Sequence, residues 1–168
     1  LQQVIKGLKR FDTNDVFTNN KVFHRKLTDN VEVAEFVDGE TIYHRVQLIN
    51  WEHPEQNDFL VVNQFEVEDQ SFKIPDIVIF VNGLPLVVIE LKSTSREDVS
   101  LKDAYLQLKN YMNVHIPSLF YYNAFLMISD GVQARAGTIT APYDRFSAWK
   151  KIEATDEVID NHQLDTLM

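Results

Sequence analysis

The sequence predicts an α/β domain with a mixed central β-sheet flanked by helices. Two observations favour this class: strand-like runs occur in the same chain as segments with helical spacing, and hairpin signals separate several of the strands. The chain has 168 residues, of which 45% are hydrophobic and 24% charged, so one domain can bury a core. We therefore expect a single domain over residues 1–168, with a linker starting at about residue 151.

The amino-terminal part is expected to form a short helix and a hairpin. Leu1–Arg10 has apolar residues on one side, as a short helix does. The β-rich runs Val31–Val37 and Thr41–Ile49 flank Asp38-Gly39, a dipeptide that favours a tight turn. The other assignments before the centre are a polar, turn-rich segment at Asp12–Asn20, a loop at Trp51–Asp58, a strand at Phe59–Val67 and a turn at Glu68–Lys73.

Two apolar runs in the middle of the chain, Ile77–Val81 and Leu86–Leu91, predict a central hairpin. Asn82-Gly83 lies between them and marks a tight turn. Neither run alternates apolar with polar residues, which is typical of strands that are buried on both faces. We therefore place these two strands in the interior of the sheet.

The carboxy-terminal part is expected to add a helix and further strands. Helical spacing of apolar residues extends over Val99–Asn113, and Ser100 with Asp103 is suited to cap its first turn. The remaining assignments are a polar connector at Ser93–Asp98, a strand at Ala124–Ile128, an extended segment or short strand pair at Val132–Thr140, and a helix starting at Asp144–Lys150.

Charge and composition narrow the class of protein. The net charge of −9 argues against a general nucleic-acid coat, which is usually basic, but permits an enzyme that meets DNA through a local patch. The chain contains no Cys, which excludes disulfides, thiolate zinc sites and a cysteine nucleophile. No run of 18 apolar residues and no signal-peptide pattern occur, so we expect a cytoplasmic protein that does not span a membrane.

Three charged residues flank the central hairpin. Asp76 precedes its first strand, and Glu90 and Lys92 end its second strand. Because the outer ends of a hairpin lie together, and residues two apart on a strand share a face, all three side chains are expected to converge. Two carboxylates and a main-chain carbonyl suit Mg²⁺, and a lysine beside them can orient water or stabilise a phosphate charge. The same spacing also fits a cluster of ion pairs at the sheet edge.

These residues also resemble a known signature. Pro75-Asp76…Glu90-Leu91-Lys92 is similar to the PD-(D/E)xK motif of nucleases. The longer string NDFLVVNQFEVED…IPDIVIFVNGLPLVVIELKS resembles the amino-terminal endonuclease region of the restriction (R) subunit of type I restriction enzymes. The similarity runs from about Val22 to Lys150.

The resemblance implies a restriction-endonuclease-like core that cuts double-stranded DNA with Mg²⁺, for which Mn²⁺ can substitute. Asp76, Glu90 and the Leu91 carbonyl would hold the cation, and Lys92 would act on water. Methyltransferase and specificity subunits would be partners. R subunits also contain an ATP-driven translocase, and this chain lacks a Gly-x-x-x-x-Gly-Lys-Ser/Thr loop, so ATP would serve only that missing part. The alternative is a catalytically silent docking domain of the same subunit.

Two further residues match the motif that follows the lysine strand in this nuclease branch. Gln107 and Tyr111 are four apart on the predicted helix and therefore share a face. They are expected to support Lys92 or contact the DNA backbone, with a half-buried core tyrosine as the alternative. The first helix of such folds commonly supplies another acidic metal ligand, but Leu1–Arg10 contains no Asp or Glu, so the identity of that ligand stays open.

Overall fold

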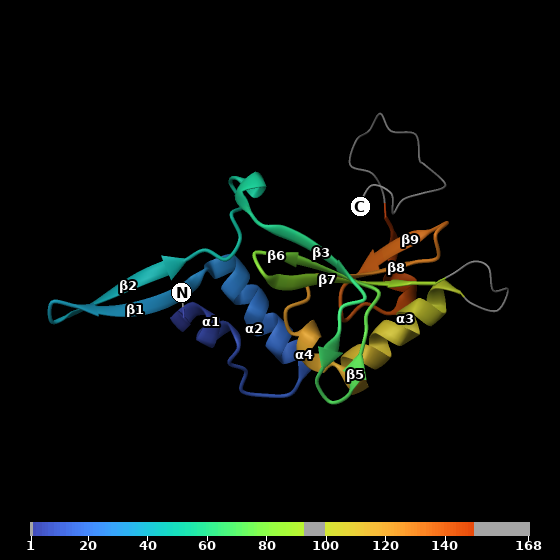
Figure 1. The fold of residues 1–168 in the computed structure, drawn as a ribbon, viewed down its shortest axis with the longest axis horizontal. Coiled ribbons are helices and arrows are strands. Elements are labelled where there is room, and N and C mark those ends of the chain that lie inside the picture. Colours follow the sequence, from blue (N-terminus) through green and yellow to red (C-terminus); the bar gives the residue numbers. More distant parts are fainter. Residues whose placement is uncertain (1, 93–99, 150–168) are drawn as a thin grey trace.

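The computed structural model describes residues 2–92 and 100–149, so the predicted connector at Ser93–Asp98 and the expected linker lie outside the described residues. A six-stranded sheet with the order β10-β9-β8-β7-β6-β3 forms the centre of the molecule (Figure 1). β7 and β8 are parallel and the other neighbours antiparallel, which confirms the predicted mixed sheet. Its strands are β3 (Phe59–Asn63), β6 (Ile77–Val81), β7 (Leu84–Leu91), β8 (Phe125–Ser129), β9 (Ala134–Gly137) and β10 (Ser147–Ala148).

Helices pack against this sheet. They are α1 (Gln2–Leu8), α2 (Val16–Asp29), α3 (Leu101–Asn110) and α4 (Pro117–Phe120), with a π-helical turn at Tyr111–His115 and 3₁₀ turns at Pro54–Gln56 and Tyr143–Arg145. The predicted cap of α3 is present: the Ser100 main-chain N–H donates to an Asp103 carboxylate oxygen at 2.7 Å. This bond satisfies a main-chain donor at the start of the helix.

Two apolar cores lie on the opposite faces of the sheet, because successive side chains of a strand alternate. On one face, Val88 of β7 is buried among residues of α3, α4 and β8. On the other face, Val87 and Ile89 are buried with Phe23 and Leu27 of α2. β7 therefore lies between both cores, as its unbroken apolar sequence predicts.

Two small antiparallel ladders lie outside the main sheet. β1 (Val31–Val37) and β2 (Glu40–Val46) form the predicted hairpin, which projects away from the body of the domain (Figure 1). Both of its turn residues, Asp38 and Gly39, have positive φ, as an Asp-Gly turn requires. β4 (Val67–Glu68) and β5 (Phe72–Lys73) overlap the two ends of Glu68–Lys73, the segment predicted as a turn, so the turn spans only the residues between these strands.

The prediction that Asp12–Asn20 is a turn-rich segment is wrong for its second half. The helix α2 begins at Val16, within that segment. Asp15 is its N-cap and accepts a hydrogen bond from the Thr18 N–H at 2.7 Å. Two of its four buried residues are asparagines, Asn19 and Asn20, so the apolar periodicity of a core-facing helix is weak. The Asn20 amide instead donates to main-chain carbonyls, including that of Asn123 at 2.7 Å.

The predicted helix at Asp144–Lys150 is wrong. A 3₁₀ turn leads into β10, and the Trp149 N–H donates to the Ala134 carbonyl at 2.9 Å, which extends the sheet. The packing of Phe146 holds this course: a Cβ added to Gly137 would lie 2.6 Å from the Phe146 ring. Tertiary contacts therefore override the local helical pattern.

The strand predicted over Phe59–Val67 is also too long. β3 ends at Asn63 because Gln64 adopts φ 51°, in the left-handed region that breaks an extended strand. The chain turns at this point, immediately beside the start of β6. This kink places Gln64 next to Asp76.

Candidate active site

The central hairpin brings Asp76 and Glu90 to the same end of the sheet. Ile77 pairs with Ile89, so the residue before β6 lies opposite the penultimate residue of β7. The Asp76 carboxylate is also tied to β7, since its Oδ2 accepts a hydrogen bond from the Leu91 N–H at 2.8 Å. The two carboxylates that are 14 positions apart in sequence thus become neighbours.

Glu90 is a buried carboxylate with an incomplete set of partners. Its side chain is 1% exposed, and its Oε1 accepts from Lys92 Nζ at 3.0 Å. Its Oε2 is buried without a hydrogen-bond partner among the described residues. Burial and, after it, the nearby Asp76 charge raise the pKa of Glu90 to about 7, although Lys92 opposes the shift. A buried carboxylate oxygen without a hydrogen-bond donor is stabilised when it binds a proton or a cation.

Lys92 belongs to a chain of hydrogen bonds that ends at α3 and the π-helical turn. Its Nζ donates to Gln107 Oε1 at 2.5 Å as well as to Glu90. The Gln107 amide in turn donates to the Tyr111 hydroxyl oxygen at 2.7 Å. Burial raises the pKa of the Tyr111 phenol, which keeps the hydroxyl protonated. Spacing predicted that Gln107 and Tyr111 share a face, and the structure directs that face at Lys92.

The donor atoms at this end of the hairpin fit a hard divalent cation. Two carboxylates face each other, and Glu90 Oε2 lacks a partner among the residues described. The N–H and C=O of one residue in an extended strand point to the same side, so the Leu91 carbonyl is directed toward Asp76 together with its N–H. Carboxylate and main-chain oxygens are the ligands that Mg²⁺ prefers. Within residues 2–92 and 100–149, no group of three or more His, Asp or Glu residues could hold a metal, so no further acidic ligand is identified.

Sequence reasoning missed one residue of this cluster. The Gln64 side-chain amide donates to Asp76 Oδ1 at 3.2 Å. Gln64 belongs to the Asn-Gln-Phe run that supports the family resemblance, which was the available signal. Spacing could not place it, because the contact depends on the kink that ends β3.

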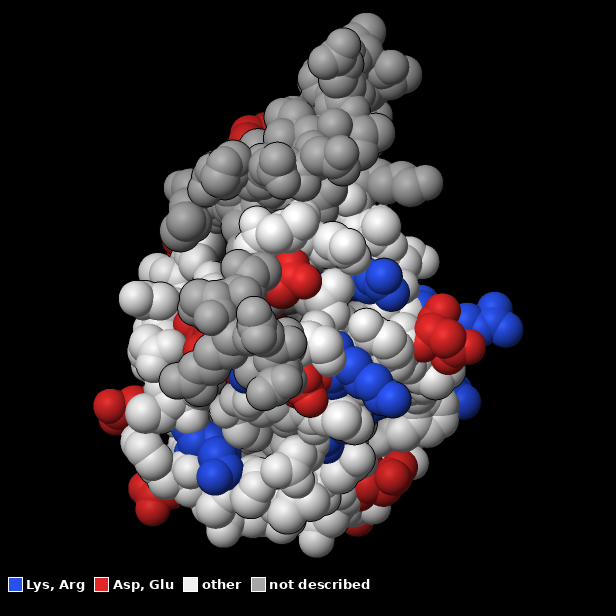
Figure 2. Space-filling view, turned by 90° about the vertical axis from the view of Figure 1, so that its right-hand side faces the viewer, with Lys and Arg blue, Asp and Glu red and all other residues white. Residues whose placement is uncertain are grey.

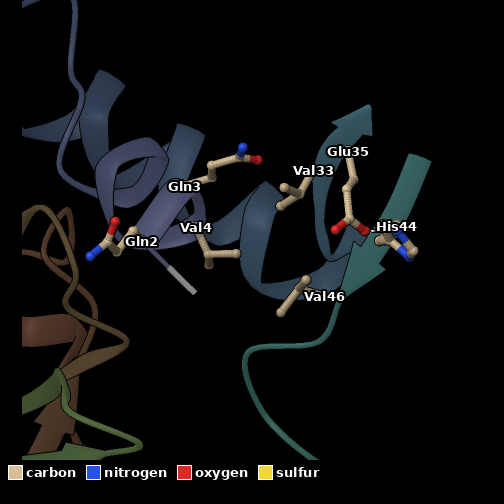
Figure 3. A pocket seen from close by; sticks show the side chains of 7 residues that line it. All are labelled: Gln2, Gln3, Val4, Val33, Glu35, His44 and Val46. Carbon is tan, nitrogen blue, oxygen red and sulfur yellow. Dashed lines mark hydrogen bonds and ion pairs between the residues drawn. The ribbon is translucent and has the colours of Figure 1, made fainter. Parts of the chain in front are cut away.

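A separate hollow lies at the other end of the molecule. Its volume is about 550 Å³, and it lies between α1 and the β1–β2 hairpin (Figure 3). Glu35 and His44 face each other across the hairpin there, 3.0 Å apart, and both are exposed. The lining contains no residue of the carboxylate cluster; it consists of Gln2, Gln3, Val4, Val33, Glu35, His44 and Val46.

The charge of the surface is mixed rather than uniformly acidic. Figure 2 shows one face of the domain, on which basic and acidic side chains are interspersed over a mostly uncharged surface. The net charge of −9 therefore does not describe every face. None of the helices in the described parts of the chain is long and apolar enough to cross a membrane.

Comparison with known proteins agrees with the resemblance. The family described as type I restriction enzyme R protein N terminus matches residues 2–145. The type I restriction enzyme HindI endonuclease subunit of Haemophilus influenzae is 40% identical over 155 residues, which cover 91% of this chain and 15% of that protein. The putative type I restriction enzyme MjaIXP endonuclease subunit of Methanocaldococcus jannaschii is 35% identical over 168 residues, 95% of this chain and 16% of that protein. The chain thus spans about a sixth of the length of these relatives, and it belongs to the family of type I restriction enzyme R proteins, whose N terminus it matches.

Proposed function

We propose that this domain is the Mg²⁺-dependent endonuclease of a type I restriction–modification complex and that it hydrolyses phosphodiester bonds of double-stranded DNA. The observation that supports the proposal most strongly is the convergence of Asp76, Glu90 and Lys92 at one end of a buried hairpin. Methyltransferase and specificity subunits are the proposed partners, and they would read modification and sequence. ATP would be used by the translocase part of such an R protein.

The proposed cation ligands are Asp76, Glu90 and the Leu91 carbonyl. Mg²⁺ at this position, or Mn²⁺ in its place, would neutralise negative charge on the phosphate and lower the pKa of a bound water. Glu90 supports this assignment because its Oε2 is buried without a protein partner among the described residues. A cation would offset the cost of burying that acceptor beside a second carboxylate.

Lys92 is proposed to orient the attacking water and to stabilise the phosphate charge. An ammonium has three N–H donors, and two of them reach Glu90 and Gln107. Among the described residues the third donor has no partner, which leaves it for a water or a phosphate oxygen. In the hydrolysis, the water oxygen bonds to phosphorus and the water gives up one proton. One P–O bond to a sugar breaks, its electron pair stays on the departing oxygen, and that oxygen takes up a proton, so that atoms and charge balance.

The alternative is a catalytically silent docking domain of the same subunit. It is favoured by the absence of a third acidic ligand among the described residues. It gives no reason for a hydrogen-bond chain that holds Lys92 on Oε1 of a buried carboxylate whose Oε2 has no partner among the described residues. DNA cleavage by the complete R protein in its complex, with and without Mg²⁺, distinguishes the two functions.

Asp76→Ala is expected to abolish divalent-cation binding at this site. The substitution removes one of the two carboxylate ligands, and Glu90, whose pKa burial still raises, would be left as the single carboxylate at the site. The measurement is calorimetric titration of the complete R protein with Mn²⁺ in the absence of nucleotide. Asp58→Ala is the matched control, because this exposed carboxylate precedes β3 at the opposite end of the β3–β6 pair. An unchanged Mn²⁺ affinity in Asp76→Ala would remove Asp76 from the site.

Gln107→Ala is expected to lower the cleavage rate about ten- to a hundredfold without loss of the cation, because it removes a charge-assisted hydrogen bond that positions Lys92. The rate is measured at saturating Mg²⁺ and compared with Gln133→Ala, which removes an exposed glutamine outside the cluster. Wild-type cleavage by Gln107→Ala would show that its contact with Lys92 has no catalytic consequence.

A further inference from the structure

Gln64 has an unusual backbone conformation for its residue type. Among the described residues, four that are not glycine have positive φ: Asn30, Asp38, Gln64 and Asn82. Asn and Asp tolerate this left-handed region because their short side chains bond locally to the main chain. A glutamine lacks that compensation, so a Gln at this position requires another reason.

The main-chain contacts of Gln64 do not supply that reason. Its N–H donates to the Asp76 carbonyl at 2.8 Å, and the Phe65 N–H donates to the Pro75 carbonyl at 3.2 Å. Any residue that adopts this kink, glycine most readily, would make the same two bonds. What distinguishes Gln64 is its side-chain amide, which reaches Asp76 Oδ1 at 3.2 Å.

The Asp76 carboxylate is consequently held from two sides. Gln64 donates to Oδ1 from the end of β3, and the Leu91 N–H donates to Oδ2 from β7. Two donors on different oxygens restrict rotation of the carboxylate plane. Each donor leaves lone pairs on its oxygen, because a carboxylate offers about four acceptor positions. The group is thus oriented and still able to accept from a cation.

The chemistry of the amide suits this task. A Lys or Arg in place of Gln64 would also donate to Asp76, but its positive charge would repel a cation. A neutral amide fixes the carboxylate without that competition. We propose that Gln64 is a positioning residue that orients Asp76 for divalent-cation binding, an inference that rests on the proposed Mg²⁺ site.

Two substitutions separate the side chain from the backbone kink. Gln64→Met keeps the length and removes the donor, whereas Gln64→Gly removes the side chain and accommodates the positive φ without strain. Both are expected to raise the Kd for Mg²⁺ about three- to tenfold, the effect of losing one solvent-exposed hydrogen bond to a charged group. Calorimetry on the complete R protein without nucleotide measures this Kd. Amide hydrogen exchange across β3 and β6 should show no loss of protection in Gln64→Gly.

Cleavage kinetics provide an independent readout. Half-saturation of the cleavage rate should require about three- to tenfold more Mg²⁺ in both variants, while the rate at saturating Mg²⁺ stays close to wild type. Asp38→Gly is the matched control, because it removes a side chain at an equally positive φ in the β1–β2 turn. This control should leave unchanged both the Kd for Mg²⁺ and the Mg²⁺ concentration that half-saturates the cleavage rate.

The outcomes distinguish failure of the positioning role of Gln64 from failure of the proposed Mg²⁺ site. A wild-type Kd in Gln64→Met and Gln64→Gly overturns the positioning role while leaving the proposed Mg²⁺ site intact. A weaker Kd that is accompanied in Gln64→Gly by loss of exchange protection across β3 and β6 also overturns it, because Gln64 then acts through the fold. Absence of Mg²⁺ binding at this site in the wild-type protein overturns the proposed function itself.

Discussion

Lys92→Ala is expected to lower DNA cleavage by about a thousandfold or more while leaving the cation bound. The ammonium lies between Glu90 and Gln107, and its removal takes away the group proposed to orient water and stabilise the phosphate charge. Losses of this size are typical when a general acid–base group or an electrostatic stabiliser is deleted. The measurement is cleavage by the complete complex at saturating Mg²⁺.

The specificity of this effect can be checked within the same protein. ATP hydrolysis and translocation should persist in Lys92→Ala. This chain contains no Gly-x-x-x-x-Gly-Lys-Ser/Thr loop that would bind the phosphates of ATP, so Lys92 is not part of such a nucleotide site. Lys102→Ala provides the control, since Lys102 is an exposed lysine on α3. Cleavage by Lys92→Ala at the parental rate would end the assignment of Lys92, and a parallel loss of ATP hydrolysis would indicate a structural defect instead.

Mg²⁺ affinity is expected to fall about a hundredfold between pH 7 and pH 5. Burial and the Asp76 charge raise the pKa of Glu90 to about 7, so below that pH a proton occupies the ligand. A cation that must displace one proton loses about tenfold in affinity for each pH unit. The affinity at this site is obtained by calorimetry as the difference between wild type and Asp76→Ala. An affinity that does not change from pH 5 to pH 8 would contradict this titration.

The same shift has a consequence for the stability of the cation-free domain. The pKa of Glu90 is raised in the folded state relative to its ordinary value of 4.5. The resulting stabilisation is fully present below about pH 4.5 and is lost as the pH rises through about 7, with an upper bound of roughly 3 kcal/mol. Above that pH, Mg²⁺ should restore protection of the β7 amides from hydrogen exchange.

The sequence specified the central hairpin well because its signals are local. Asn82-Gly83 and two apolar runs define the turn and the register, and the register alone places Asp76 opposite Glu90. The helical spacing likewise placed Gln107 and Tyr111 on one face. Their geometry therefore followed from periodicity, whereas their catalytic roles stay predictions.

The features that sequence reasoning missed depend on tertiary contacts. α2 was not predicted because Asn19 and Asn20 occupy inward positions that an apolar pattern would reserve for hydrophobic side chains. β10 replaced the expected helix because pairing with β9 decided the backbone. The contact between Gln64 and Asp76 was not predicted, because no residue pattern indicates that a glutamine at the end of a strand adopts a positive φ. Each case involves a partner that is distant along the chain.

The position of β3 at the edge of the sheet has a consequence for handling this domain in isolation. Within the described residues, no strand pairs with its outer side, and Phe59 remains 59% exposed, with Leu60 and Val61 also exposed. Unpaired main-chain groups beside apolar side chains form a template for intermolecular β-pairing. At high concentration, an excised domain would therefore tend to form sheet-like aggregates through this edge. Whether the excised domain stays dispersed in solution would depend on whether a charged side chain or a covering segment shields the unpaired edge of β3.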